Sequence, residues 1–158
     1  MKPRRAIQMT PGYDGAVEID THVRITATRS EARSLRCRPG TFSWRYARDG
    51  APTALYHAGC DFAILWEKAG TASASSPDLG AVGGGMWRGV QVGRLEAMDK
   101  IDAARKDIGR WATARLVDYC VMGSTASDMA TKYGYDDRHM AIILNEDLKA
   151  CALHFEYL

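Results

Sequence analysis

The sequence predicts a mainly α-helical protein, a small helical bundle with a C-terminal helix-turn-helix-like unit and a short N-terminal β-strand. Three observations predict this fold. Apolar residues recur at helical spacing through most of 53–158. Residues 17–27 alternate with a period of two, and residues 125–145 carry helix caps and a glycine at helix-turn-helix spacing. A chain of 158 residues has the length of one domain.

Charge divides the chain into two parts. Residues 1–48 contain ten Lys/Arg and four Asp/Glu, a net charge of +6, whereas residues 49–158 contain eleven and fifteen, a net charge of −4. The first part is therefore expected to be a basic arm. No apolar run approaches the roughly 20 residues of a membrane helix, and the N-terminus lacks the apolar core of a signal peptide. We expect a cytoplasmic protein that does not bind membranes.

Within the arm (1–48), residues 17–27 predict one β-strand, with Val, Ile and Thr on one face and charged residues on the other. A single strand needs a partner, which is either an inconspicuous neighbour or another chain. The following residues, 28–48, are rich in arginine, and Phe42, Trp44 and Tyr46 are interleaved with these arginines.

Residues 49–70 are expected to form a helix over 53–69 that packs on the C-terminal unit. Thr53 is its expected cap, and Gly59 indicates the close approach of another helix. Residues 71–91, rich in glycine and serine, predict a loop.

Residues 92–158 are expected to form the helix-turn-helix-like domain. Its first helix spans roughly 92–122, with Leu95, Met98 and Trp111 in the apolar stripe and a bend at Gly109.

The segment 125–145 predicts two further helices joined by a tight turn. Thr125 and Asp136 are the expected N-caps, and Gly134 is suited to the left-handed turn between the helices. Ala130 lies where the helices would cross, and Met140 faces inward with the apolar residues that follow it. A plain helical hairpin within a bundle would show the same capping, so both interpretations stay open.

A helix-turn-helix favours double-stranded DNA as the partner. The predicted DNA-binding residues of this unit and of the basic arm are Lys132, Arg138, His139, Asn145, Arg29, Arg33 and Arg36. Asp136 and Asp137 argue against this interpretation, because phosphates repel carboxylates. The arginines of the arm would equally suit a solvated surface.

Catalytic, metal and cofactor sites are not expected. The four cysteines lack the spacing of a zinc site, and we expect buried free thiols. Pairs such as His57 with Asp61, or Asp99 with Asp102, occur by chance on any polar helix face. We therefore do not predict an enzyme.

The sequence also resembles a group of small helical proteins of unknown function from alphaproteobacteria and their phages, associated with helix-turn-helix regulators. The residues that carry the resemblance are Ala58-Gly59, Phe62, Trp66-Glu67-Lys68-Ala69, Ser76-Pro77-Asp78-Leu79, Ile108-Gly109, Leu116, Cys120 and Gly123. It covers about residues 42–155 and implies a regulatory, DNA-associated protein without implying any catalytic residue.

Two alternatives to a DNA-binding regulator remain. One is a module that binds a protein such as the transcription machinery. The acidic residues near the turn could contact such a partner, and an unpaired strand at 17–27 could extend its sheet. The other is a virion or assembly component. A homodimer is compatible with each.

Overall fold

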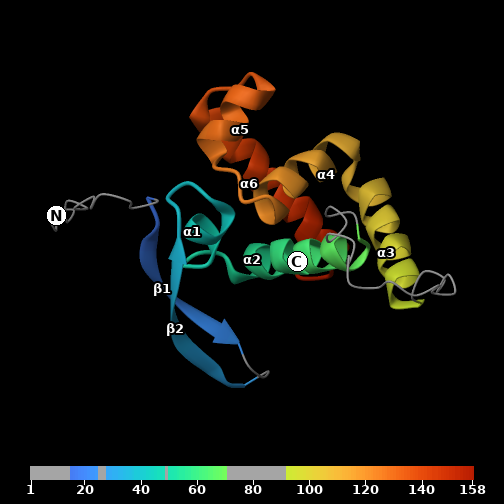
Figure 1. Ribbon diagram of the computed structural model, residues 1–158, viewed down its shortest axis with the longest axis horizontal. Helices are drawn as coiled ribbons and strands as arrows, with labels where there is room; N and C mark the ends of the chain where they lie inside the picture. The colour runs from blue at the N-terminus through green and yellow to red at the C-terminus, as the bar shows by residue number, and fades with distance from the viewer. Residues whose placement is uncertain (1–14, 25–27, 49, 71–91) are drawn as a thin grey trace, which may run out of the picture.

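The computed structural model describes residues 15–24, 28–48, 50–70 and 92–158. The elements are β1 (Val17–Arg24), β2 (Ser30–Cys37), α1 (Phe42–Tyr46), α2 (Thr53–Lys68), α3 (Val92–Ile108), α4 (Arg110–Leu116), the π-helix η1 (Val117–Val121), α5 (Ala126–Tyr133) and α6 (Asp137–His154). The protein is mainly helical, as expected, and it has a short two-stranded sheet near the N-terminus (Figure 1). The predicted loop at 71–91 lies outside the described residues, as do 1–14 and 25–27.

The predicted strand is not alone, because β2 pairs with it in an antiparallel hairpin. Glu18 faces Arg36 and Ile19 faces Leu35 across the two strands. Of the two partners expected for this strand, the structure shows the inconspicuous neighbour, which is the arginine-rich segment that follows it. The second strand was not recognised because most of its side chains are exposed, so it has no apolar face to give a period of two.

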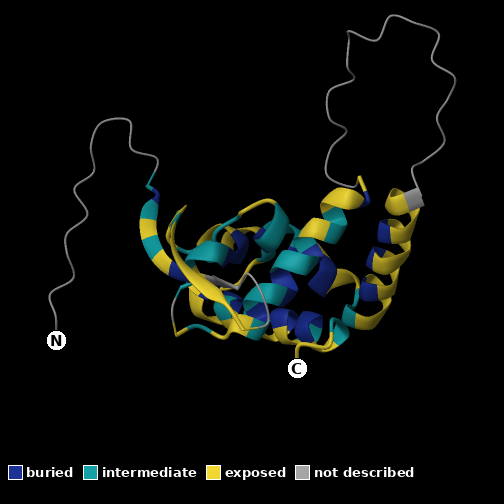
Figure 2. Ribbon diagram, turned by 90° about the horizontal axis from the view of Figure 1, so that it is seen from below, coloured by how far each residue is buried: buried dark blue, intermediate teal, exposed yellow. Residues whose placement is uncertain are grey.

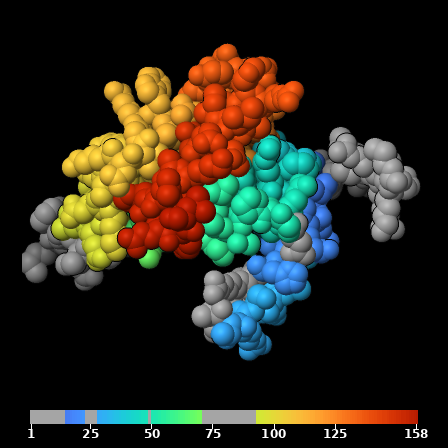
Figure 3. Space-filling view, turned by 180° about the vertical axis from the view of Figure 1, so that it is seen from behind, coloured from blue at the N-terminus to red at the C-terminus, as the bar shows by residue number. Residues whose placement is uncertain are grey.

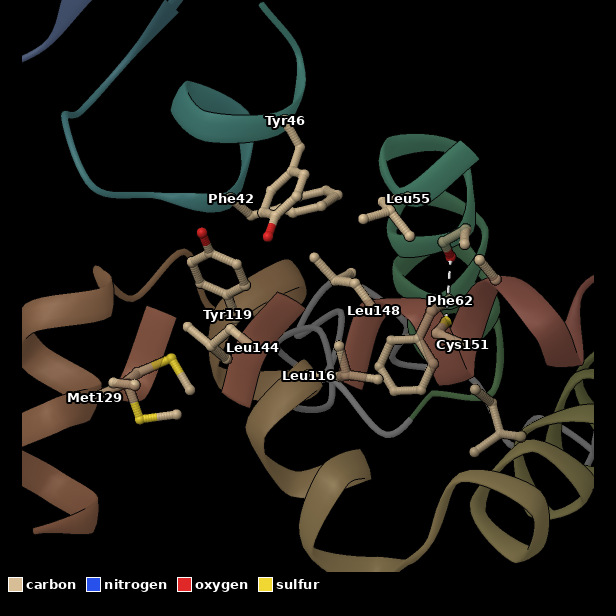
Figure 4. Close-up of a cluster of buried hydrophobic side chains, with 14 of the residues drawn as sticks. Phe42, Tyr46, Leu55, Phe62, Leu116, Tyr119, Met129, Leu144, Leu148 and Cys151 are labelled. Atoms are coloured by element: carbon tan, nitrogen blue, oxygen red, sulfur yellow. Dashed lines mark hydrogen bonds between the residues drawn. The ribbon is translucent and has the colours of Figure 1, made fainter. Parts of the chain in front are cut away.

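The core lies where α2 and α6 meet α1, α4 and η1. Figure 4 shows its side chains converging from these elements, and Figure 2 shows the buried positions along the inner faces of the helices. The largest fully buried side chains are Phe62, Leu116, Tyr119, Met129, Met140, Leu144, Leu148 and Cys151. All four cysteines are free thiols. Only Cys151 is fully enclosed, and burial raises the pKa of its thiol to about 12.

Gly59 permits a close approach, as expected, although its neighbour is an aromatic ring. A Cβ at this position would lie 2.4 Å from Cζ of Phe42, so α1 packs on α2 only because the side chain is absent. The helix α2 begins at Thr53, as predicted, but its N-cap is Pro52 and Thr53 lies inside the first turn.

The predicted long helix at 92–122 is divided at Gly109. This residue has φ +98°, a conformation that favours glycine, and α4 begins directly after it. Ile101 and Leu116 are buried, but Leu95, Met98 and Trp111, expected in the apolar stripe, are 48%, 40% and 68% exposed.

None of the described helices is both long and apolar enough to cross a membrane.

Candidate nucleic-acid interface

Two side-chain caps and one glycine define α5, α6 and the turn between them. The Thr125 hydroxyl accepts a hydrogen bond from the Asp128 N–H at 3.1 Å, and the Asp136 carboxylate accepts from the His139 N–H at 2.9 Å. Gly134 ends α5 in the left-handed conformation, with φ +76°. The expected caps and turn residue are thus confirmed, and they separate two helices that bury Met129 and Met140 against the core.

Two polar contacts hold these helices on the preceding segment. Arg115 of α4 donates to both carboxylate oxygens of Asp147 of α6, at 2.6 and 2.9 Å. Asp118 of η1 accepts from Lys132 at 2.6 Å and from the Tyr133 hydroxyl at 2.7 Å, and both of these donors belong to α5. The orientation of α6 is therefore fixed by charged groups as well as by apolar packing.

The predicted DNA-binding residues of the α5–α6 unit differ in their availability. Lys132 is bound to Asp118, and Nδ1 of His139 contacts the Asp136 carboxylate. Asn145 donates through Nδ2 to the Tyr46 hydroxyl at 3.0 Å, which ties α6 to α1. Asn145 would have to leave Tyr46 to bind adenine through both amide groups, whereas Lys132 and His139 are held to carboxylates that compete with a ligand for them.

Arg138 differs from those three residues. It is exposed in the first turn of α6, and its guanidinium forms no ion pair with another described residue.

The predicted arginines of the arm lie on or beside the hairpin. Arg33 pairs with Glu31 at 3.5 Å, and Arg36 is opposite Glu18 in the sheet. Arg29 directly precedes β2. The hairpin projects from α1 away from α5 and the start of α6 (Figures 1 and 3). The structure therefore does not bring these three arginines to the α5–α6 turn.

A different part of the arm lies against the α5–α6 unit. The Ala126 N–H donates to the Gly40 carbonyl at 2.9 Å, and Tyr46 is the partner of Asn145. This α1 segment, residues 38–48, contains the three arginines Arg38, Arg45 and Arg48 and no acidic residue. Sequence reasoning noted arginines interleaved with aromatics here, but no spacing connected them to α6.

Of these arginines, Arg48 is half-buried, with its guanidinium 3.9 Å from the Trp44 ring centroid. Arg38 and Arg45 are exposed and form no ion pair with another described residue. They are the cationic side chains that this segment can offer to a ligand.

Acidic residues oppose them near the turn. Asp128, Asp136 and Asp137 are all exposed. The pKa of Asp136 is lowered, first by the His139 N–H and then by the His139 ring. This carboxylate therefore remains ionised at neutral pH, and an anionic ligand has to be positioned away from it.

Among the described residues, no group of three or more His, Cys, Asp or Glu side chains could hold a metal ion. Comparison with protein-family models, with curated proteins and with solved structures finds no match. What the unit binds must therefore be inferred from its own geometry.

Proposed function

We propose that this protein binds double-stranded DNA, with the N-terminal half of α6 in the major groove and the α1 segment on the adjacent phosphates. One observation carries the proposal: α6 starts with a capped N-terminus after a left-handed turn, and its first two turns expose Arg138 and Ile142 while Met140 and Leu144 are buried in the core. An α-helix fits the major groove, and helix-turn-helix proteins contact base edges with the first turns of the second helix.

In this arrangement, Arg138 is the residue that reads sequence. A guanidinium can bind O6 and N7 of a guanine together, and Ile142, which is 54% exposed one turn later, can contact a thymine methyl group. Arg38 and Arg45 neutralise phosphates and offset the acidic residues of the turn. The hairpin arginines are not part of this surface.

The test is a mobility-shift titration of the full chain against fragments of its own genomic neighbourhood at two salt concentrations. We expect one fragment to bind more tightly than the others, and affinity to fall with salt. Arg138→Ala should weaken that preferred complex by about 1–3 kcal/mol and reduce the preference. Binding that is absent for every fragment, or insensitive to salt, would contradict the proposal.

A second candidate is a protein partner that covers the same surface. Ile142 and Tyr135 are 54% and 48% exposed beside Asp136 and Asp137, and an apolar anchor among carboxylates suits a basic protein surface. This candidate predicts partners that are captured equally from nuclease-treated and untreated lysate, and lost with Ile142→Asp. Partners that disappear after nuclease treatment would favour DNA.

A further inference from the structure

A groove of about 440 Å³ lies between α2, α3 and the end of α6. This volume is in the range of small-molecule sites. Its apolar lining includes Ile64 and Leu65 from α2, Ala103 from α3 and Phe155 after α6. Ile64 is 47% exposed, so the groove offers apolar surface that no described side chain covers completely. The proposed DNA surface involves the opposite end of α6.

The chain end beside the groove is held in a fixed, strained turn. Glu156 has φ +61°, which is costly for a residue with a side chain. The turn allows the Tyr157 hydroxyl to donate to Asp61 at 2.6 Å, and the Tyr157 ring stacks on His57. Phe155, which lines the groove, directly precedes this turn.

The polar lining of the groove consists of one carboxylate, one histidine and two lysines. Asp61 accepts from Tyr157, and His154 contacts Asp107 at 2.6 Å, so these groups are already engaged. Lys68 and Lys100 also line the groove.

Both ammonium groups lie near Glu96. Lys100 pairs with this carboxylate at 2.9 Å and lowers its pKa, and the positive charge of Lys68 contributes to the same lowering. Among the described residues, Lys68 forms no ion pair, so no described carboxylate is bound to this positive charge beside the apolar lining.

We propose that this groove binds an amphiphilic anion, a small molecule whose apolar chain covers Ile64, Leu65 and Phe155 and whose carboxylate or phosphate head binds Lys68 and Lys100. The inference does not depend on DNA binding. It requires only the described groove and its two lysines.

Calorimetric titration of the full chain, without DNA, tests the proposal. The probes are decanoate and decyl phosphate, with decanol lacking the charge and acetate lacking the chain. We expect at least one of the two amphiphilic anions to bind more tightly than decanol and acetate. Replacing both lysines, Lys68→Gln with Lys100→Gln, should weaken the affinity for that probe by about fivefold to tenfold. This is the contribution expected of two exposed ion pairs between the anionic head and the lysines.

Lys149→Gln is the matched control, because Lys149 is an exposed α6 lysine paired with Glu146 at 2.7 Å and lies outside the groove. It should leave the affinity unchanged. Saturation by the tighter-binding anion should also shift the NMR methyl signals of Ile64 and Leu65. Equal affinity for decanol, equal loss in the Lys149 variant, or no binding of either anion would overturn the proposal.

Discussion

The ion pair between Arg115 and Asp147 should stabilise the packing of α6 on α4. Their side chains are only 17% and 9% exposed, and the guanidinium donates to both carboxylate oxygens. Asp147→Ala leaves the guanidinium without its counter-charge in a poorly hydrated position. Removing one partner of a buried pair costs about 3–5 kcal/mol. Because Arg115 retains some access to water, we expect the lower end, about 3 kcal/mol.

Glu146→Ala is the control, because it also replaces an acidic residue of α6 by alanine, at the position next to Asp147. The Glu146 side chain is 63% exposed and pairs with Lys149, so its loss should cost less than about 1 kcal/mol. Urea unfolding followed by far-UV circular dichroism measures both. With a slope of about 2 kcal/mol per M, Asp147→Ala should lower the midpoint by about 1.5 M.

A third variant separates burial of charge from loss of packing. Replacing both partners, Arg115→Met with Asp147→Leu, should recover most of the lost stability, because apolar side chains of similar size can replace a buried ion pair. If Asp147→Ala destabilises no more than Glu146→Ala does, the reasoning about this ion pair is wrong.

Three further predictions concern the fold. Gly59→Ala should lower the unfolding free energy by about 1–3 kcal/mol, because the new Cβ would overlap the Phe42 ring. A Gly59→Ser variant as stable as the unsubstituted protein would contradict this packing. Gly134→Ala should cost about 1 kcal/mol in the same urea assay, from backbone strain alone, because the space around it is open. The hydrogen bond to Asp61 raises the pKa of Tyr157 to about 12. The contribution of this hydrogen bond to the free energy of unfolding is therefore complete below pH 10 and is lost as the pH approaches 12. The tyrosinate absorbance that appears near pH 12 should be smaller by one tyrosine in Tyr157→Phe, while the late titration of Tyr56 remains.

Local signals in the sequence were sufficient for the α5–α6 region. Thr125, Gly134 and Asp136 act within four residues of themselves, so their types and spacing predicted the caps and the turn that the structure has. β2 gave no such signal. Its side chains are mostly exposed, and it is recognisable only through its pairing with β1.

Long-range contacts could not be read from spacing. Tyr46 and Asn145 are 99 positions apart, and this contact is what brings the α1 segment, rather than the hairpin arginines, to α6. Periodicity did not decide the exposure of Trp111 either. Positions 111 and 112 both fit the stripe, and the structure buries Ala112 with Ile101 and Leu116 while Trp111 is 68% exposed.

The most direct test of the proposed DNA surface compares an arginine of the α1 segment, which belongs to the surface, with an arginine of the hairpin, which does not. The slope of log affinity against log salt is measured for Arg45→Ala and for Arg33→Ala, both of which remove an exposed arginine of the N-terminal part. We predict that Arg45→Ala reduces the magnitude of the slope by about 1, because one phosphate contact is lost, and that Arg33→Ala leaves it unchanged. A slope that changes with Arg33 and not with Arg45 would place the DNA on the hairpin and contradict the account.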